Sequence, residues 1–345
     1  MSARPYDSHT ESHSVSHKSR PYRVVIHGLP HFCQKLTGLL NGDGWEISFH
    51  SHGGAQELFA LANAMRRCDL AYTWGGRIDL GKFLLGARCL GVKRLVMLWS
   101  GSDALWAQKD AVAGKMHPWV AAKTHWAVSP WIAEEVQSVG LNCEHVQVSF
   151  VRVEHDIRPM PAKFSVLSYV PCADKAELYG WGQIVDAAKA LPSMTFKVVG
   201  LRGSGTLPAP PNVQIEGWAD NLAPHIREAS VIFRPVRHDG LSFMVLESMA
   251  QGRHVLYSYP LQGTTHVKDA GAAIRELQRL SNLHETGSLG VNIQGLEIVG
   301  CEYSEGHVRH NLLERWEKII LSCSAPQPDR IRSKSESAAS QPVSS

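Results

Sequence analysis

The chain has 345 residues, 44% of them hydrophobic, and its 35 basic and 32 acidic side chains leave a formal net charge of +3. This length suits about two domains of roughly 150 residues each, and the near-neutral charge gives no reason to expect a nucleic-acid partner. No apolar run approaches the roughly 18 residues that span a bilayer, and the N-terminus has no apolar signal-peptide core. We therefore expect a cytoplasmic protein without an integral membrane segment, with peripheral attachment to the inner membrane face as an open alternative.

The composition of the two chain ends and the spacing of the cysteines narrow the kinds of structure that the chain can form. Residues 1–21 and 324–345 are rich in serine and poor in apolar side chains, so both are predicted to be disordered tails. The seven cysteines are scattered without C-x-x-C spacing, which argues against a zinc site and against a disulfide framework.

The first half of the chain, residues 22–150, alternates short β-rich apolar runs with longer helical patterns. We expect strands at 23–26, 69–74, 94–99 and 125–128, and helices at 55–67, 79–91, 103–112 and 131–139. Such alternation is typical of parallel βαβ units with right-handed crossovers.

Residues 151–163 show no period and contain prolines, so we interpret them as a linker, after which the alternation resumes in a second half, 164–305. There we expect strands at 165–170, 195–199, 213–215, 231–233 and 254–257, helices at 181–190, 221–228 and 242–251, and a closing helix at 306–323. Ligands of open parallel sheets bind at the carboxyl ends of the strands, which here predicts a site in a cleft between two α/β halves.

The segment from Phe233 to Gly252 carries the most chemical information. A strand ends at Phe233, Gly240 permits a tight turn, and Ser242 is a good N-cap for a helix whose C-terminus suits Gly252. The free N–H groups at this helix start would bind an anion such as phosphate. Glu247, one turn further in, suits the two hydroxyls of a ribose, although a solvated glutamate on a capped helix has the same spacing.

This segment resembles a known enzyme family. Asp239-x7-Glu247, followed by Ser-Met-Ala-x-Gly-Arg-x-Val, is similar to the E-x7-E motif of retaining glycosyltransferases with the GT-B fold, the family-four-like group. Further segments that match the pattern of this family are 127–136, 198–205, 213–219 and 229–235. The resemblance covers roughly residues 22–320 and implies two Rossmann-like parallel-sheet domains facing a central cleft.

The resemblance implies a role for each matching residue on the donor side. Glu247 would hold the ribose of a nucleotide-sugar donor, and Asp239 would act in catalysis by contacting hydroxyls of the transferred sugar. Backbone N–H groups of Gly240, Leu241 and Ser242 would face the sugar and the diphosphate. The turn at Trp218 would flank the nucleobase, while a core aromatic at a strand end fits the same pattern.

The chain departs from the family at two places. Asp239 is one methylene shorter than the usual glutamate, and Tyr179 stands where the family has a diphosphate-binding lysine before a glycine. We expect Lys175, Arg202 or Arg237 to supply the missing positive charge, because the leaving diphosphate must be stabilised.

The first half is expected to bind the acceptor. Trp99 and Ser100 end a strand, and Gly28 ends another, so all three are candidate acceptor-binding residues. Asp103 could act as a weak base or cap the helix that follows, and capping is the interpretation we favour slightly. There is no D-x-D triplet, so we expect neither a metal nor another cofactor.

The leading hypothesis is therefore a metal-independent, hexosyltransferase-like retaining enzyme that moves a sugar from a nucleotide-diphosphate sugar to an unidentified acceptor hydroxyl. A nucleotide-sugar 2-epimerase and a catalytically inactive nucleotide-sugar-binding module remain alternatives. A nicotinamide dehydrogenase is disfavoured, because no G-x-G-x-x-G follows the first strand.

Overall fold

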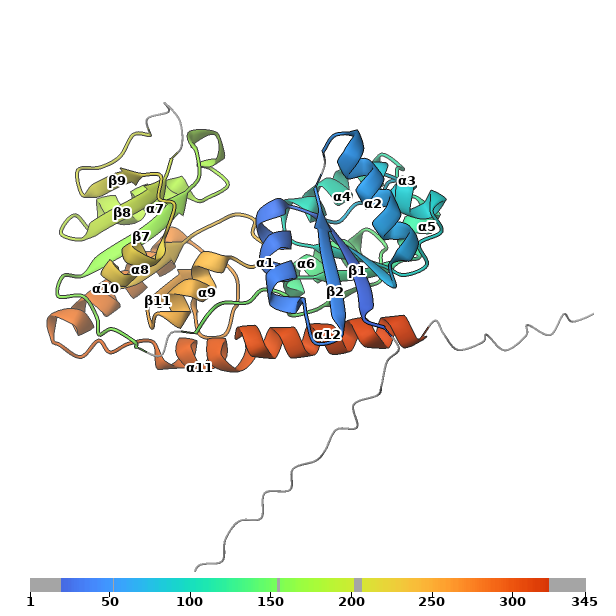
Figure 1. Ribbon diagram of the computed structural model, residues 1–345. Coiled ribbons are helices and arrows are strands. Elements are labelled where there is room, and N and C mark those ends of the chain that lie inside the picture. Colours follow the sequence, from blue (N-terminus) through green and yellow to red (C-terminus); the bar gives the residue numbers. More distant parts are fainter. Residues whose placement is uncertain (1–19, 52, 154–155, 202–206, 323–345) are drawn as a thin grey trace, which may run out of the picture.

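The computed structural model describes residues 20–51, 53–153, 156–201 and 207–322. It contains two six-stranded parallel sheets that lie side by side (Figure 1). This confirms the predicted α/β class with one parallel sheet in each half. The two predicted tails lie almost wholly outside the described residues, as does Arg202.

The first sheet has the strand order β2-β1-β3-β4-β5-β6. Its strands are β1 (Tyr22–Gly28), β2 (Trp45–His50), β3 (Leu70–Trp74), β4 (Leu95–Trp99), β5 (Thr124–Ala127) and β6 (Cys143–His145). The helices of this half are α1 (Pro30–Leu40), α2 (Ala55–Arg67), α3 (Lys82–Cys89), α4 (Ser102–Val112), α5 (Pro118–Ala121) and α6 (Pro130–Ser138).

The second sheet has the strand order β12-β11-β10-β7-β8-β9. Its strands are β7 (Ser165–Val170), β8 (Thr195–Gly200), β9 (Val213–Gly217), β10 (Val231–Arg234), β11 (His254–Tyr257) and β12 (Thr265–His266). The helices are η1 (Ala173–Lys175), α7 (Trp181–Ala190), α8 (Ala223–Glu228), α9 (Phe243–Ala250), α10 (Ala270–Glu285), α11 (Ile293–Glu302) and α12 (Glu305–Ser322).

In each sheet the strand order reverses at one point, between β1 and β3 in the first and between β7 and β10 in the second. Loops that leave neighbouring strands on opposite sides of such a point diverge and leave room for a ligand. In the second sheet the loop after β10 leads directly into α9. The geometry therefore places the Asp239–Glu247 segment at the reversal point.

The stretch after β1 differs from the expectation. No helix or strand was predicted between residues 27 and 54, but helix α1 begins at Pro30 and strand β2 follows it. Proline is compatible with the first helical position because it needs no N–H there. The buried side chains of α1 are Cys33, Leu36 and Leu40, a helical spacing that the prediction overlooked.

Helices α10 and α11 were also not predicted. Helix α10 begins after Asp269, whose side chain accepts a hydrogen bond from the N–H of Ala272, and it buries Ala273, Leu277 and Leu280 on one face. An N-cap followed by this apolar spacing was readable in the sequence.

Helix α12 belongs to the first half in space, although it follows the second half in sequence. It runs along the first half in Figure 1, and its Trp316 is fully buried beside Tyr72 and Trp45. The two connections between the halves also meet, because the N–H of Val151 donates to the carbonyl of Tyr303 at 2.9 Å. Within the described residues, no helix is both long and apolar enough to cross a membrane.

Candidate functional site

The two halves touch along a surface that we call the domain junction. From the second half it contains His238–Phe243, and from the first half Phe32, Ser100, Trp131 and Glu135. Trp131 Nε1 donates to the carbonyl of Asp239 at 2.8 Å, and His238 Nε2 lies 2.9 Å from a carboxylate oxygen of Glu135. The rings of Phe32 and Phe243 stack with centroids 5.4 Å apart.

At Gly240 the backbones of the two halves approach each other closely. A Cβ atom built at this position would lie 1.9 Å from the carbonyl oxygen of Ser100. No side chain larger than hydrogen fits, so the backbones of the two halves are in direct contact here.

The start of α9 offers donors without protein acceptors. Ser242 occupies the predicted N-cap position, but its side chain makes no capping hydrogen bond. Among the described residues no acceptor faces the N–H groups of Gly240, Leu241 and Ser242. Free amides at a helix start favour an anion.

Glu247 lies one turn into α9 and is half-buried. Burial raises the pKa of its carboxyl group, and the charge of Lys35 on α1 acts in the opposite direction. Lys35 also sits over the ring of Phe243, with Nζ 5.1 Å from the centroid. In the described part of the chain the carboxylate of Glu247 has no hydrogen-bond partner, so it is available to a ligand.

Asp239 is held by two side chains of the second sheet. Its Oδ2 accepts from Arg234 Nε at 2.8 Å and from the Tyr257 hydroxyl at 3.1 Å. The Asp239 side chain remains 16% exposed. Burial and the neighbouring carboxylate raise the pKa of Tyr257 well above its usual value, so the phenol stays protonated and donates.

Arg234 ends β10 beside the reversal point and was not singled out from the sequence. Its guanidinium lies 5.4 Å from the centre of the Tyr179 ring. Burial acts to lower the pKa of Arg234, but the carboxylate of Asp239 outweighs it and the net shift is upward. An arginine directly after a fully apolar strand is the signal that could have identified it.

Three basic residues were expected to bind the diphosphate, and the structure describes two of them. Lys175 is exposed on η1. Arg237 is 63% exposed and pairs with Glu177. Arg202 lies outside the described residues. Trp218 is 43% exposed, and its Nε1 donates to Asp220 at 2.8 Å, so it is a surface residue and not part of the core.

In the first half, Asp103 is buried and its carboxylate accepts from the N–H groups of Gly76, Ser100, Gly101 and Ala104 at 2.7–3.1 Å. Burial raises the pKa of Asp103, and these hydrogen bonds counteract the shift. The geometry is that of a loop anchor: Asp103 lies in the first turn of α4, whose N-cap residue is Gly101.

The three acceptor candidates divide into two kinds. The Trp99 side chain is fully buried, so it is a core residue that offers no surface to an acceptor. Ser100 and Gly28 lie at strand ends, Ser100 at the domain junction and Gly28 in contact with Trp74, where a Cβ would lie 2.1 Å from the carbonyl oxygen.

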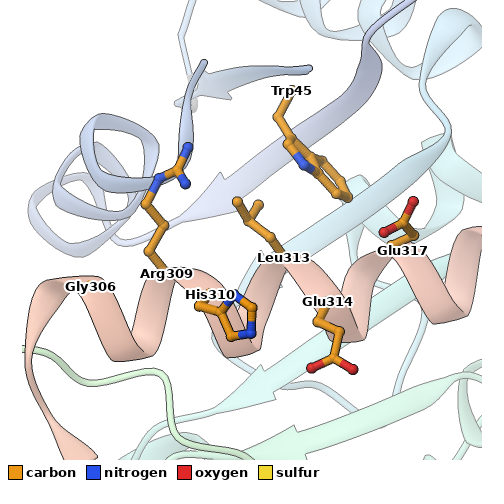
Figure 2. Close-up of a pocket in the computed structure, with 7 residues that line it drawn as sticks. All are labelled: Trp45, Gly306, Arg309, His310, Leu313, Glu314 and Glu317. Carbon is orange, nitrogen blue, oxygen red and sulfur yellow. The ribbon is translucent and has the colours of Figure 1, made fainter. Parts of the chain in front are cut away.

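A groove of about 370 Å³ lies away from the domain junction, between α12 and the first half (Figure 2). It is lined by Trp45, Gly306, Arg309, His310, Leu313, Glu314 and Glu317. Arg309 donates to the carbonyl of Leu39 and to Asp43. The polar side chain at one end of the groove therefore ties α12 to the first half. Among the described residues no group of three His, Cys, Asp or Glu side chains could hold a metal ion.

Comparison with known proteins gives matches at the level of structure. No protein-family model matches the sequence, and no curated protein matches it. The Anabaena protein HepE, solved with UDP and glucose, has a TM-score of 0.63 at 10% identity, and the alignment covers 86% of this chain and 100% of HepE. Sucrose-phosphate synthase from Thermosynechococcus elongatus has a TM-score of 0.62 at 13% identity. This alignment covers 87% of this chain and 100% of the synthase chain.

A third similar structure is the pneumococcal O-GlcNAc transferase GtfA in complex with UDP and GlcNAc. It has a TM-score of 0.56 at 12% identity, and the alignment covers 76% of this chain and 60% of GtfA. At such identities the similarity establishes the fold. The protein thus has the GT-B fold, in which two parallel-sheet halves meet at the carboxyl ends of their strands.

Proposed function

We propose that this protein is a glycosyltransferase that uses a nucleoside-diphosphate sugar as donor. The observation that carries the proposal is the segment from Asp239 to Glu247. It combines free helix-start amides with two carboxylates at the reversal point of the second sheet. The similar structures of HepE and GtfA were obtained with UDP-glucose or with UDP and a sugar, which supports a donor of this class.

On the donor side, the free carboxylate of Glu247 accepts hydrogen bonds from the two ribose hydroxyls. The N–H groups of Gly240, Leu241 and Ser242 bind the diphosphate, for which free amides at a helix start are suited. Asp239, whose Oδ1 is not used by Arg234 or Tyr257, accepts from hydroxyls of the transferred sugar.

On the acceptor side, we propose that Ser100 and Gly28 line the position of the incoming hydroxyl. Retention fits the domain junction, because Asp103 is occupied by backbone amides and does not serve as a strong base. The anomeric C–O bond breaks and its electron pair leaves with the diphosphate. The acceptor oxygen bonds to the same face of the anomeric carbon, and its proton passes to the departing diphosphate. We further propose that the transferred group is a hexose and that no metal is needed.

The direct test is an incubation with UDP-, GDP- and ADP-sugars, in which free nucleotide is measured with and without glycan, lipid-linked and small-molecule hydroxyl acceptors. Acceptor-dependent release with retained anomeric configuration supports the proposal. Conversion without acceptor would indicate an epimerase, and binding without turnover would indicate a binding module. Absence of binding to all donors would reject the function.

Glu247→Gln tests the ribose contact. A hydrogen bond to a charged group contributes about 1.5–3 kcal/mol, so we expect roughly a tenfold to hundredfold rise in Kd for the preferred nucleoside diphosphate. Its 2′,3′-dideoxy analogue lacks both hydroxyls and should bind wild type and variant alike. His50→Ala, on β2 of the first half, is the control and should leave both Kd values unchanged. An equal loss for the analogue would contradict the assignment.

A further inference from the structure

The reversal point of the second sheet contains a buried cation. Arg234 is the last residue of β10, and its side chain is 8% exposed. The loop after β7 closes over it, because Gly180 (φ +72°) approaches the carbonyl of Pro235 so closely that a Cβ would lie 1.8 Å from the oxygen. Arg237 N–H also donates to the carbonyl of Leu178 at 2.9 Å. The guanidinium is therefore enclosed by loops of neighbouring strands.

Most of the hydrogen-bonding capacity of this guanidinium is unused. Nε donates to Asp239, while neither Nη atom has a partner among the described residues. Some buried side-chain nitrogen atoms of the described residues have no hydrogen-bond partner, for example Nε of Arg227 and of Arg253. No atom of Arg234 is among them. Both Nη atoms thus keep some accessible surface, although the side chain as a whole is 8% exposed.

The surroundings of Arg234 favour an anionic ligand. Tyr257 and Tyr179 are its other close neighbours, and among the described residues Asp239 is the one carboxylate that contacts it. Asp239 engages the guanidinium through Nε, so the edge that carries Nη1 and Nη2 stays free for a bidentate contact in the plane of the group. The unpaired amides of Gly240–Ser242 follow in the same loop, six residues along the chain.

We propose that Arg234 binds the diphosphate of the nucleotide donor through Nη1 and Nη2 while its Nε positions Asp239. The inference rests on the proposed function and deepens it. A guanidinium matches two phosphate oxygens at once, and a desolvated site strengthens the attraction. One residue thereby couples the group that leaves to the carboxylate that faces the transferred sugar. Lys175 and Arg237, which are exposed, are not required.

The test is the dependence of nucleotide affinity on the number of phosphates. The nucleoside, its monophosphate and its diphosphate are titrated calorimetrically into the full chain, with inorganic pyrophosphate as a competitor. Arg234→Met should weaken diphosphate binding about tenfold to hundredfold, leave nucleoside binding unchanged, and abolish competition by pyrophosphate. Arg279→Met, which removes an exposed arginine from α10 of the same half, is the control for net charge and should bind as wild type.

A second variant separates the phosphate contact from the ion pair. Arg234→Met leaves a carboxylate without its partner and lowers stability, so Asp239→Asn and the double variant Arg234→Met/Asp239→Asn are compared at equal folded fraction. The double variant should still bind the diphosphate at least tenfold more weakly than Asp239→Asn. Equal affinities, or a loss on Arg237→Met in place of Arg234→Met, would overturn the proposal for Arg234 and leave the function intact. If wild type binds no nucleoside diphosphate, both proposals fail.

Discussion

The buried imidazole of His125 shows how a single hydrogen-bond pair determines a protonation state. The side chain is 2% exposed in the first half, and Trp99 Nε1 donates to its Nδ1 at 3.1 Å. Since the indole N–H can only donate, Nδ1 must be unprotonated, and Nε2 carries the proton toward the carbonyl of Val120 at 3.1 Å. A second proton would set two N–H groups against each other.

The consequence is a pH-dependent stability. Burial lowers the pKa of His125 from 6.5 to about 4. The unfolded state therefore binds more protons between pH 6.5 and pH 4, and stability is lost as the pH falls through this window. We expect His125 to account for a loss of about 2 kcal/mol between pH 7 and pH 5. Denaturant unfolding at both pH values measures it.

The matched variant for this prediction is His125→Gln, which keeps a donor toward Val120 but does not titrate. Its free energy of unfolding should fall less between pH 7 and pH 5 than that of wild type. His310→Gln, at an exposed position on α12, should follow the wild-type curve. If His125→Gln shows the full wild-type loss, the assignment of the neutral imidazole is wrong.

At the scale of elements, the loop between β10 and α9 does two tasks with one stretch of backbone. It presents the free amides of the proposed donor site, and at Gly240 it touches the loop that follows β4. The loop after β4 is held in place by the carboxylate of Asp103, which accepts hydrogen bonds from three N–H groups at residues 100–104 and from the N–H of Gly76. A displacement of either loop therefore changes the contact between the halves.

Gly240→Ala tests this coupling. The added Cβ meets the backbone of Ser100, 1.9 Å from the oxygen and 2.7 Å from the carbon, so the halves must separate locally. We expect a loss of about 1–3 kcal/mol in stability. In glycosyl transfer we expect a fall of more than tenfold in kcat with a smaller change in donor Kd, because the donor groups all belong to the second half.

The control for Gly240→Ala is Gly300→Ala, on α11, where a Cβ meets nothing within 4 Å. Alanine in a helix interior is favoured over glycine by up to about 1 kcal/mol, so this variant should be as stable as wild type or more so. Stopped-flow and steady-state measurements on both variants give Kd and kcat. An unchanged kcat in Gly240→Ala would show that the contact has no part in transfer.

For the whole molecule, α12 is the element that ties the last segment of the chain to the first. Trp316 packs with ring centroids 5.2 Å from Tyr72 and 6.1 Å from Trp45. On the outer side the groove of Figure 2 shows the same helix held by Arg309. Helix α12 thus packs on the first half, while the domain junction joins the loop before α9 to residues of α1 and α6.

Trp316→Ala should therefore destabilise the first half, although the residue follows the second half in sequence. Removal of a fully buried tryptophan side chain costs about 3–5 kcal/mol. Trp106→Ala makes the same substitution at a residue that is 63% exposed, and we expect less than 1 kcal/mol there. Equilibrium unfolding in denaturant compares the two. Similar values would contradict the packing of α12.

Local patterns were sufficient for much of the fold. The helix 55–67, the strand 165–170, the helix 181–190 and the strand 254–257 were predicted with the bounds that the structure shows. Alternation of periods two and 3.6 and the turn glycines are properties of neighbouring residues, which is why the class and the Asp239-x7-Glu247 segment could be read from the sequence.

Only the tertiary structure decided which charges and rings meet. The apolar strand before Arg234 marks the residue, but its pairing with Asp239 and Tyr257 depends on how β10, β11 and the following loop are placed. In the same way, the charge of Lys35, in the first half, acts on Glu247 in the second half. The side chain of Trp99 at the end of β4 points into the core, which its position at a strand end did not determine. Contacts between residues far apart in sequence leave no local period, so the two-sheet architecture and the Asp239–Glu247 segment were readable from the sequence, and the side chains that contact this segment were not.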